Sequence, residues 1–150
     1  MPKRIMPART IVIVGGGRNV GKTFLAQELG RLLPRSTVIK IGLHHARPEK
    51  NSNFFALETP YSIIESSFPD AELLIIESGS ILDDPDLNPD LVVFLPSSDP
   101  TGDKPGSERR RQRAHLVRGE SFDPSEVERI RTRLDIDEQT MGSILKAVSG

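Results

Sequence analysis

The sequence TIVIVGGGRNVGKT occupies residues 10–23, and it decides how the rest of the chain is interpreted. Residues 16–23 match the pattern G-x-x-x-x-G-K-T, which is typical of a loop that binds nucleotide phosphates. The β-branched run at residues 11–14 predicts a buried parallel strand before this loop. Leucines recur at helical spacing after it, and Pro34 ends that run, so a helix is expected there. A glycine-rich turn that binds no ligand is the alternative, and the order of strand, loop and helix disfavours it.

The chemistry of a nucleoside triphosphate explains this pattern. Backbone N–H groups can surround an anion only where the chain curls closely, which favours glycine, and the following helix N-terminus adds unpaired N–H groups and a favourable dipole. Lys22 is expected to contact the β- and γ-phosphates, and Thr23 to offer its hydroxyl to Mg²⁺. The predicted nucleotide-binding residues of this segment are Gly16, Gly17, Arg18, Asn19, Val20, Gly21, Lys22, Thr23 and Phe24.

Composition sets limits on the class of protein. The chain has 150 residues, a formal net charge of −1 and no cysteine. This length predicts a single domain over residues 1–150, with residues 1–9 as a loose N-terminal arm. The small net charge gives no overall attraction to nucleic acid or membrane, and without cysteine there is no disulfide or thiolate chemistry. No signal-peptide or membrane-spanning run is evident, so we expect a soluble, cytoplasmic protein.

Further apolar runs alternate with helical patterns along the chain. Because these runs are apolar throughout, they predict buried strands of a mostly parallel sheet. The predicted fold class is therefore α/β, a three-layer P-loop NTPase fold with helices on both faces of the sheet. Strands are expected at residues 37–41, 72–77, 91–95 and 115–117. Helices are expected at residues 107–114 and 124–134, after Asp137, and over residues 54–68 as a helical face that Pro60 divides.

Glu77 is the candidate for the second half of the nucleotide site. A P-loop protein needs an acidic residue near its Mg²⁺, and Glu77 ends the apolar run of residues 73–76. It is expected to hold Mg²⁺ together with Thr23, or to polarise a nucleophile, and with Lys22 it forms the predicted catalytic pair. A strand-end carboxylate that faces solvent is the alternative. The acidic residues at 83–86 lie among prolines and indicate a solvated turn.

Two other segments contain candidate site residues. His44 and His45 follow the second predicted strand, at the sheet edge where ligands of parallel sheets bind. One of them is expected to contact a second substrate, an anion or a metal, since consecutive residues of an extended chain point in opposite directions. Lys104 and Pro105 lie in the long loop after the fourth strand, where we expect contact with the nucleotide base. Ordinary polar loop residues are the alternative at both places.

The predicted helix at residues 107–114 is rich in arginine, whereas residues 78–103 contain no Lys or Arg. Its arginines are expected to contact phosphate, a partner or an acidic surface of the same protein, and a solvated helix face is the alternative. No arginine is placed by sequence as a finger for phosphoryl transfer. Arg18, inside the loop, is a candidate to act across a dimer.

Several segments together resemble the molybdopterin-guanine dinucleotide biosynthesis protein B (MobB) family. The resemblance covers about residues 10–118 and implies a small GTPase-like protein, often a homodimer, that assists a nucleotidyltransferase attaching GMP to molybdopterin. It implies that residues 16–23 hold the phosphates and Mg²⁺, that Glu77 is the acidic strand-end residue, and that His44 and His45 flank the active face. The segments that carry it are residues 14–23, 38–40, 44–45, 74–79 and 104–106.

Three functions remain open at this stage. The first is a GTP-binding accessory protein or slow Mg²⁺-dependent NTPase of molybdenum cofactor biosynthesis. The second is a small-molecule kinase or ligase, in which His44 and His45 would bind the acceptor. The third is a non-catalytic module that uses a nucleotide as a switch. No Asn-Lys-x-Asp motif for guanine is present, and the residues therefore do not distinguish GTP from ATP. Only the resemblance favours GTP.

Overall fold

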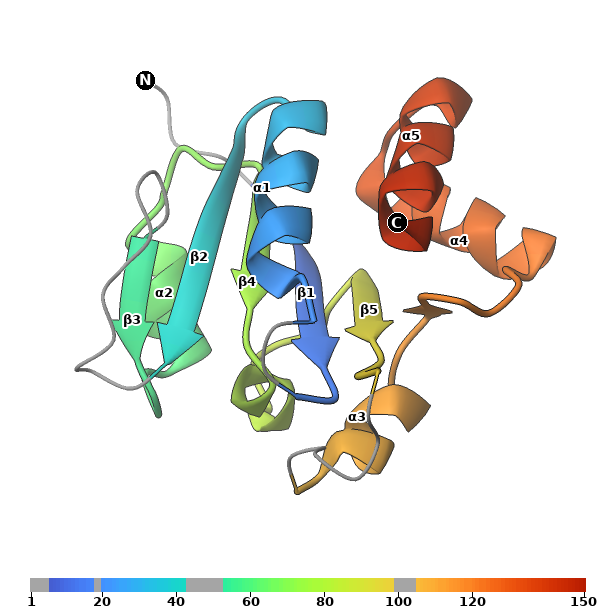
Figure 1. The fold of residues 1–150 in the computed structure, drawn as a ribbon. Coiled ribbons are helices and arrows are strands. Elements are labelled where there is room, and N and C mark those ends of the chain that lie inside the picture. The colour runs from blue at the N-terminus through green and yellow to red at the C-terminus, as the bar shows by residue number, and fades with distance from the viewer. Residues whose placement is uncertain (1–5, 18–19, 43–52, 99–104) are drawn as a thin grey trace.

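Six parallel strands form the central sheet, in the order β3-β2-β4-β1-β5-β6 (Figure 1). The computed structural model describes residues 6–17, 20–42, 53–98 and 105–150. The predicted α/β class is confirmed, and within the described residues every strand pairing is parallel. The strands are β1 (Arg9–Gly15), β2 (Ser36–Gly42), β3 (Asn53–Ala56), β4 (Leu73–Glu77), β5 (Leu91–Leu95) and β6 (Leu116–Val117).

Helices cover both faces of this sheet. Side chains alternate along β1, so that Ile11 and Ile13 point to one face while Val12 and Val14 point to the other, and all four are fully buried. The first face packs against α1 (Lys22–Leu32), α4 (Pro124–Leu134) and α5 (Glu138–Ser149). The second packs against α2 (Tyr61–Ser66) and the 3₁₀ helix η1 (Ser80–Asp83), and the short helix α3 (Ser107–Gln112) lies at the ends of the strands (Figure 1).

The position of β1 decides where a ligand can bind. β1 lies between β4 and β5, with Ile13 in register with Glu77 on one side and Val93 on the other. Its carboxyl end leads into the glycine-rich loop and then into α1. In parallel sheets the ligand lies beyond the carboxyl ends of the strands, so the loop and the end of β4 share one edge.

One predicted element is wrong. Residues 53–56 form a strand, β3, where a helical face had been predicted over residues 54–68. Phe54, Phe55 and Leu57 fit a helical period, but the chain instead adds a parallel strand to the edge of β2, with Lys40 in register with Phe54. Sheet pairing thus overrides local periodicity. The second half of the prediction is confirmed, because Pro60 directly precedes α2.

The N-terminal arm is shorter than predicted. Ala8 is buried, its N–H lies 3.3 Å from Glu65 Oε2, and Arg9 already belongs to β1. The two C-terminal helices are confirmed with their caps, since Asp123 Oδ1 accepts a hydrogen bond from the Ser125 N–H, and Asp137 Oδ1 accepts one from the Thr140 N–H. None of the helices in the described ranges has the length and apolar character that a bilayer-spanning helix needs.

Candidate functional site

The loop after β1 is built on close backbone packing. Gly16 and Gly17 are buried, and the Gly16 N–H donates a hydrogen bond to the Leu95 carbonyl at 3.1 Å. Gly21 has a φ of 94°, in the left-handed region that favours glycine, and it directly precedes the first turn of α1. Lys22 is therefore the first residue of α1, where unpaired N–H groups favour an anion. Arg18 and Asn19, two predicted contacts, lie outside the described residues.

Gly15 lies outside the motif, but the fold of the loop requires a glycine there. A Cβ at this position would lie 2.6 Å from Val20 Cγ2 and 3.2 Å from Lys22 Cδ. The loop thus folds back on its own starting residue, and a side chain there would displace both Val20 and the stem of Lys22. The run of three consecutive glycines is the signal in the sequence, because its first member, Gly15, lies before the first position of the pattern.

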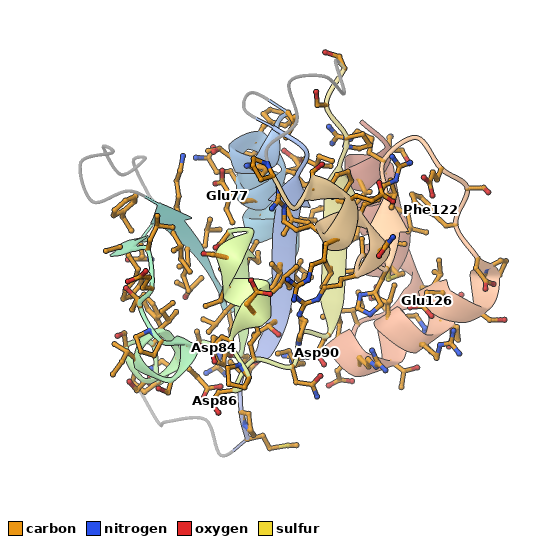
Figure 2. All side chains as sticks on the ribbon, turned by 90° about the horizontal axis from the view of Figure 1, so that it is seen from below. Glu77, Asp84, Asp86, Asp90, Phe122 and Glu126 are labelled. Atoms are coloured by element: carbon orange, nitrogen blue, oxygen red, sulfur yellow. The ribbon has the colours of Figure 1, made fainter. Side chains whose placement is uncertain are left out.

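Thr23 and Glu77 meet directly, although they lie 54 residues apart in the chain. The Thr23 hydroxyl lies 2.9 Å from Glu77 Oε1 and 3.0 Å from Glu77 Oε2, so it donates to a carboxylate that is itself buried. Figure 2, viewed from the side to which the strand ends point, places Glu77 beside α1. The alternative of a carboxylate facing solvent is thereby excluded, since Glu77 is only 6% exposed.

Lys40 also lies beside Glu77, although it was not among the predicted site residues. Its Nζ lies 3.9 Å from Glu77 Oε1, because β2 and β4 pair with Lys40 in register with Glu77. Parallel partners in register point to the same face, so both side chains lie on the α1 face. In the sequence, Lys40 is a charged residue inside the apolar run Val38-Ile39-Lys40-Ile41 and belongs to a segment that carries the family resemblance. Its contact with Glu77 could not be known without the strand order.

The turn after β4 is fixed to β1. The Ser78 N–H donates to the Ile13 carbonyl at 3.2 Å, and Ser78 Oγ accepts the Ile81 N–H at 3.3 Å where η1 begins. Gly79 lies in this turn, between Ser78 and the first residue of η1. The first bond holds the segment that follows Glu77 against the carboxyl-terminal part of β1, and the second closes the turn on itself.

The remaining predicted site residues differ in how far they are buried. Val20 is partly buried against the core, whereas Phe24 is 70% exposed on the first turn of α1. Pro105 is exposed, and its carbonyl accepts a hydrogen bond from Arg110 Nη1 at 3.1 Å. His44, His45 and Lys104 lie outside the described residues.

The side chains at this edge fit an Mg²⁺ ion that is bound mainly by phosphate oxygens. Mg²⁺ prefers oxygen ligands and takes few from the protein in nucleotide sites, and Thr23 and Glu77 present a hydroxyl and a carboxylate within hydrogen-bonding distance of each other. Within the described residues no group of three or more His, Cys, Asp or Glu side chains converges on one point. Thr23 would thus bind the ion directly through its hydroxyl, and Glu77 would bind it through a water molecule.

A cavity of about 340 Å³ opens at the same edge of the sheet. Three strand ends contribute to it: Ile41 near the end of β2, the turn after β3, and η1 after β4. It is lined by Ile41, Leu57, Glu58, Thr59, Ser80, Ile81 and Asp84. Its walls therefore combine aliphatic side chains with hydroxyls and carboxylates.

No protein-family model matches this sequence, and no curated protein matches it. The likeness to the MobB family therefore stays a prediction from the sequence.

Proposed function

We propose that this protein binds a nucleoside triphosphate together with Mg²⁺ at the glycine-rich loop and hydrolyses it slowly. The observation that carries the proposal is the contact of 2.9 Å between the Thr23 hydroxyl and the buried Glu77 carboxylate. This pair combines the two oxygen groups that a P-loop site needs, and it lies at the N-terminus of a helix that follows a glycine loop.

Each residue has a distinct part in the proposed reaction. The backbone of the loop and the first turn of α1 orient the phosphates, and the Lys22 ammonium offsets negative charge that develops on them. When bound, Mg²⁺ neutralises phosphate charge. Glu77 would orient a water molecule through a hydrogen bond, and the Lys40 ammonium, 3.9 Å from Glu77 Oε1, offsets the negative charge of this buried carboxylate.

The nucleotide, the oligomeric state and the partner protein are proposed from the resemblance to the MobB family alone. On that basis the nucleotide is GTP, the protein forms a homodimer, and the partner is a nucleotidyltransferase that attaches GMP to molybdopterin. We therefore propose an accessory GTPase of molybdenum cofactor biosynthesis.

The test is a set of calorimetric titrations with GTP and ATP, each with and without Mg²⁺, followed by measurement of phosphate release. We expect Mg²⁺-dependent binding, a preference for GTP and slow release. Lys22→Ala should abolish binding, whereas Lys146→Ala, a matched change at an exposed lysine of α5, should not. Bound nucleotide at one hundred times its Kd should also raise the free energy of unfolding by about 2.7 kcal/mol. Failure of the wild type to bind either nucleotide would overturn the proposal, and binding without any phosphate release would favour a nucleotide-dependent switch.

The cavity beside η1 supports a second candidate, a small-molecule kinase or ligase. It opens at the same sheet edge as Glu77 and has hydroxyl and carboxylate groups suited to a polar acceptor. Such an enzyme would release phosphate or ADP only when an acceptor is added. Filling the cavity by Leu57→Trp, at an exposed lining residue, should then remove acceptor-dependent turnover and leave nucleotide affinity unchanged, whereas the accessory GTPase would show no response to acceptors.

A further inference from the structure

The arginine-rich segment around α3 divides into two groups. Arg109 and Arg113 both pair with Asp83, at 3.4 Å and 3.1 Å, and Arg111 pairs with Glu120 and lies over the Phe94 ring at 5.9 Å. These three cations are thus neutralised by carboxylates of the same chain, which is one of the outcomes that the sequence left open. Arg110, the fourth arginine of this segment, points away from these carboxylates and toward Gly15.

Arg110 reaches the start of the glycine-rich loop. Its Nη2 lies 3.4 Å from the carbonyl oxygen of Gly15, the last residue of β1, and its Nη1 donates to the Pro105 carbonyl at 3.1 Å. Both acceptors are neutral, and the described residues include no carboxylate that pairs with it. A guanidinium has several further N–H donors that these two contacts do not use.

The stem of Arg110 lies against the turn after Glu77. A Cβ placed on Gly79 would be 2.9 Å from Arg110 Cδ and 3.3 Å from its Nε. Gly79 follows Glu77 by two residues, and Gly15 immediately precedes the loop. The guanidinium is therefore held between the two segments that border the proposed phosphate site.

This placement brings positive charges together. Lys22 and the N-terminus of α1 already favour an anion at the loop, and Arg110 adds a third, half-buried positive group. Both side chains lie beside Gly15, since Arg110 Nη2 is 3.4 Å from the Gly15 carbonyl oxygen and Lys22 Cδ would be 3.2 Å from a Cβ placed on Gly15. A polyphosphate bound at the loop would therefore face both cations. Arg118 Nη1 also comes near, 3.5 Å from a Cβ placed on Gly21, but Arg118 donates to the Val148 and Ala147 carbonyls at the end of α5.

We propose that Arg110 contacts the terminal phosphate of the bound nucleotide and stabilises the charge that develops on it during hydrolysis. The arginine is supplied by the same chain, from α3, and not by a partner. This inference rests on the proposed nucleotide binding, and it identifies the residue that distinguishes a triphosphate from a diphosphate.

The test compares affinities for GTP and GDP, and for ATP and ADP, with Mg²⁺ by calorimetry. We expect Arg110→Ala to reduce the preference for triphosphate by at least about tenfold and to slow phosphate release by at least as much. Arg110→Lys should restore part of the loss, because a lysine supplies the charge without the forked geometry. Arg109→Ala removes the same charge from the same helix but leaves Asp83 paired with Arg113, so it should change neither quantity by more than about twofold.

A second variant tests the geometry without changing any charge. Gly79 has φ −86° and ψ −33°, which alanine accepts, so Gly79→Ala mainly displaces the Arg110 stem. It should lower the triphosphate preference in the wild type and have no further effect when combined with Arg110→Ala. An additive effect in the double variant would show that Gly79 acts independently and would contradict the placement of Arg110.

The outcomes separate this inference from the proposed function. If the wild type binds no nucleotide, the proposed function fails and this inference fails with it. If the wild type prefers triphosphate and Arg110→Ala keeps that preference, only the role of Arg110 is overturned. Urea unfolding of each variant checks that it is folded, and a folded Arg110→Ala protein with wild-type ratios would settle the matter against the proposal.

Discussion

At the scale of single residues, the contact between Thr23 and Glu77 has both a structural and a chemical consequence. A buried carboxylate is costly unless it is hydrogen-bonded or paired, and Glu77 has the Thr23 hydroxyl and the Lys40 ammonium nearby. The same hydroxyl is the proposed Mg²⁺ ligand. One side chain therefore stabilises the buried carboxylate in the free protein and, under the proposed function, would bind the ion when nucleotide is present.

Replacing Thr23 by valine should affect stability and binding together. Valine keeps the shape but removes the hydroxyl, so Glu77 loses a hydrogen bond while it stays buried. We expect the free energy of unfolding to fall by about 1–3 kcal/mol in urea titrations. We also expect Mg²⁺ to lose its effect on nucleotide affinity. Thr23→Ser retains the hydroxyl and is the control, and an unchanged Mg²⁺ dependence in the valine variant would contradict the assignment of Thr23 as a metal ligand.

At the scale of elements, two helical glycines differ in what surrounds them. Gly30 lies inside α1, where a Cβ would be 2.8 Å from Val38 Cγ2 on β2. Gly142 lies inside α5, and a Cβ there would meet nothing within 4 Å. Gly30 thus lets α1 approach the sheet closely, and this approach sets the distance between α1 and the strand that carries Lys40.

Alanine should therefore act in opposite directions at these two glycines. At Gly142 it should stabilise the protein by about 0.8–1 kcal/mol, since alanine has the higher helix propensity. At Gly30 the same gain is opposed by overpacking against Val38, which costs about 1–3 kcal/mol, so a net loss of stability is expected. Thermal or urea unfolding of both variants measures the difference. Gly30→Ala should become stabilising in a Val38→Ala background, and a stabilising effect without that second change would show that α1 tolerates a wider spacing.

At the scale of the whole molecule, His115 joins the end of the sheet to the C-terminal helices. Its Nδ1 accepts a hydrogen bond of 2.8 Å from the N–H of Val92 in β5, and its Nε2 lies 4.0 Å from Glu126 Oε1 on α4. Burial lowers the pKa of His115 below 6.5, although the Glu126 carboxylate opposes this. The folded protein therefore favours the neutral imidazole, which is also the form that can accept the bond from Val92.

Acid should weaken the fold through this histidine. Its folded pKa is lower than its unfolded pKa, so its contribution is complete above pH 6.5 and is lost as the pH falls from there toward the folded pKa. We expect the wild type to lose more unfolding free energy between about pH 7.5 and about pH 5.5 than His115→Asn, which keeps an acceptor but does not titrate. Equal pH dependence in urea titrations would contradict this.

Asp90 changes the free energy of unfolding with pH in the direction opposite to His115, so it affects the same comparison. Burial raises its pKa above 3.8, although its carboxylate accepts the Thr10 N–H at 2.9 Å. Its contribution to stability is therefore present at low pH and is lost as the pH rises through the folded pKa. Because Asp90 and His115 interact, the comparison of wild type with His115→Asn is repeated in an Asp90→Asn background, where the remaining difference in pH dependence reports the histidine.

Much of the fold follows from local patterns. Continuous apolar runs predict β1, β4 and β5 because these strands are buried on both faces, and the β-branched residues of β2 predict that strand although only one of its faces is fully buried. Proline or aspartate marks the starts of α2, α4 and α5. The edge strand β3 was missed. It is half exposed and only four residues long, so its pattern is too weak to separate from that of a helix.

The sequence by itself determined the phosphate-binding pattern, the α/β class and the candidacy of Glu77, because these depend on spacing and on the chemistry of a few residues. Only the tertiary structure decided which distant residues meet. Lys40 reaches Glu77 through the strand order, Thr23 reaches it through the packing of α1, and Arg110 reaches Gly15 across 95 residues of chain. Contacts of this range depend on the order of the strands and on close packing against glycines, and neither leaves a periodic signal in the sequence.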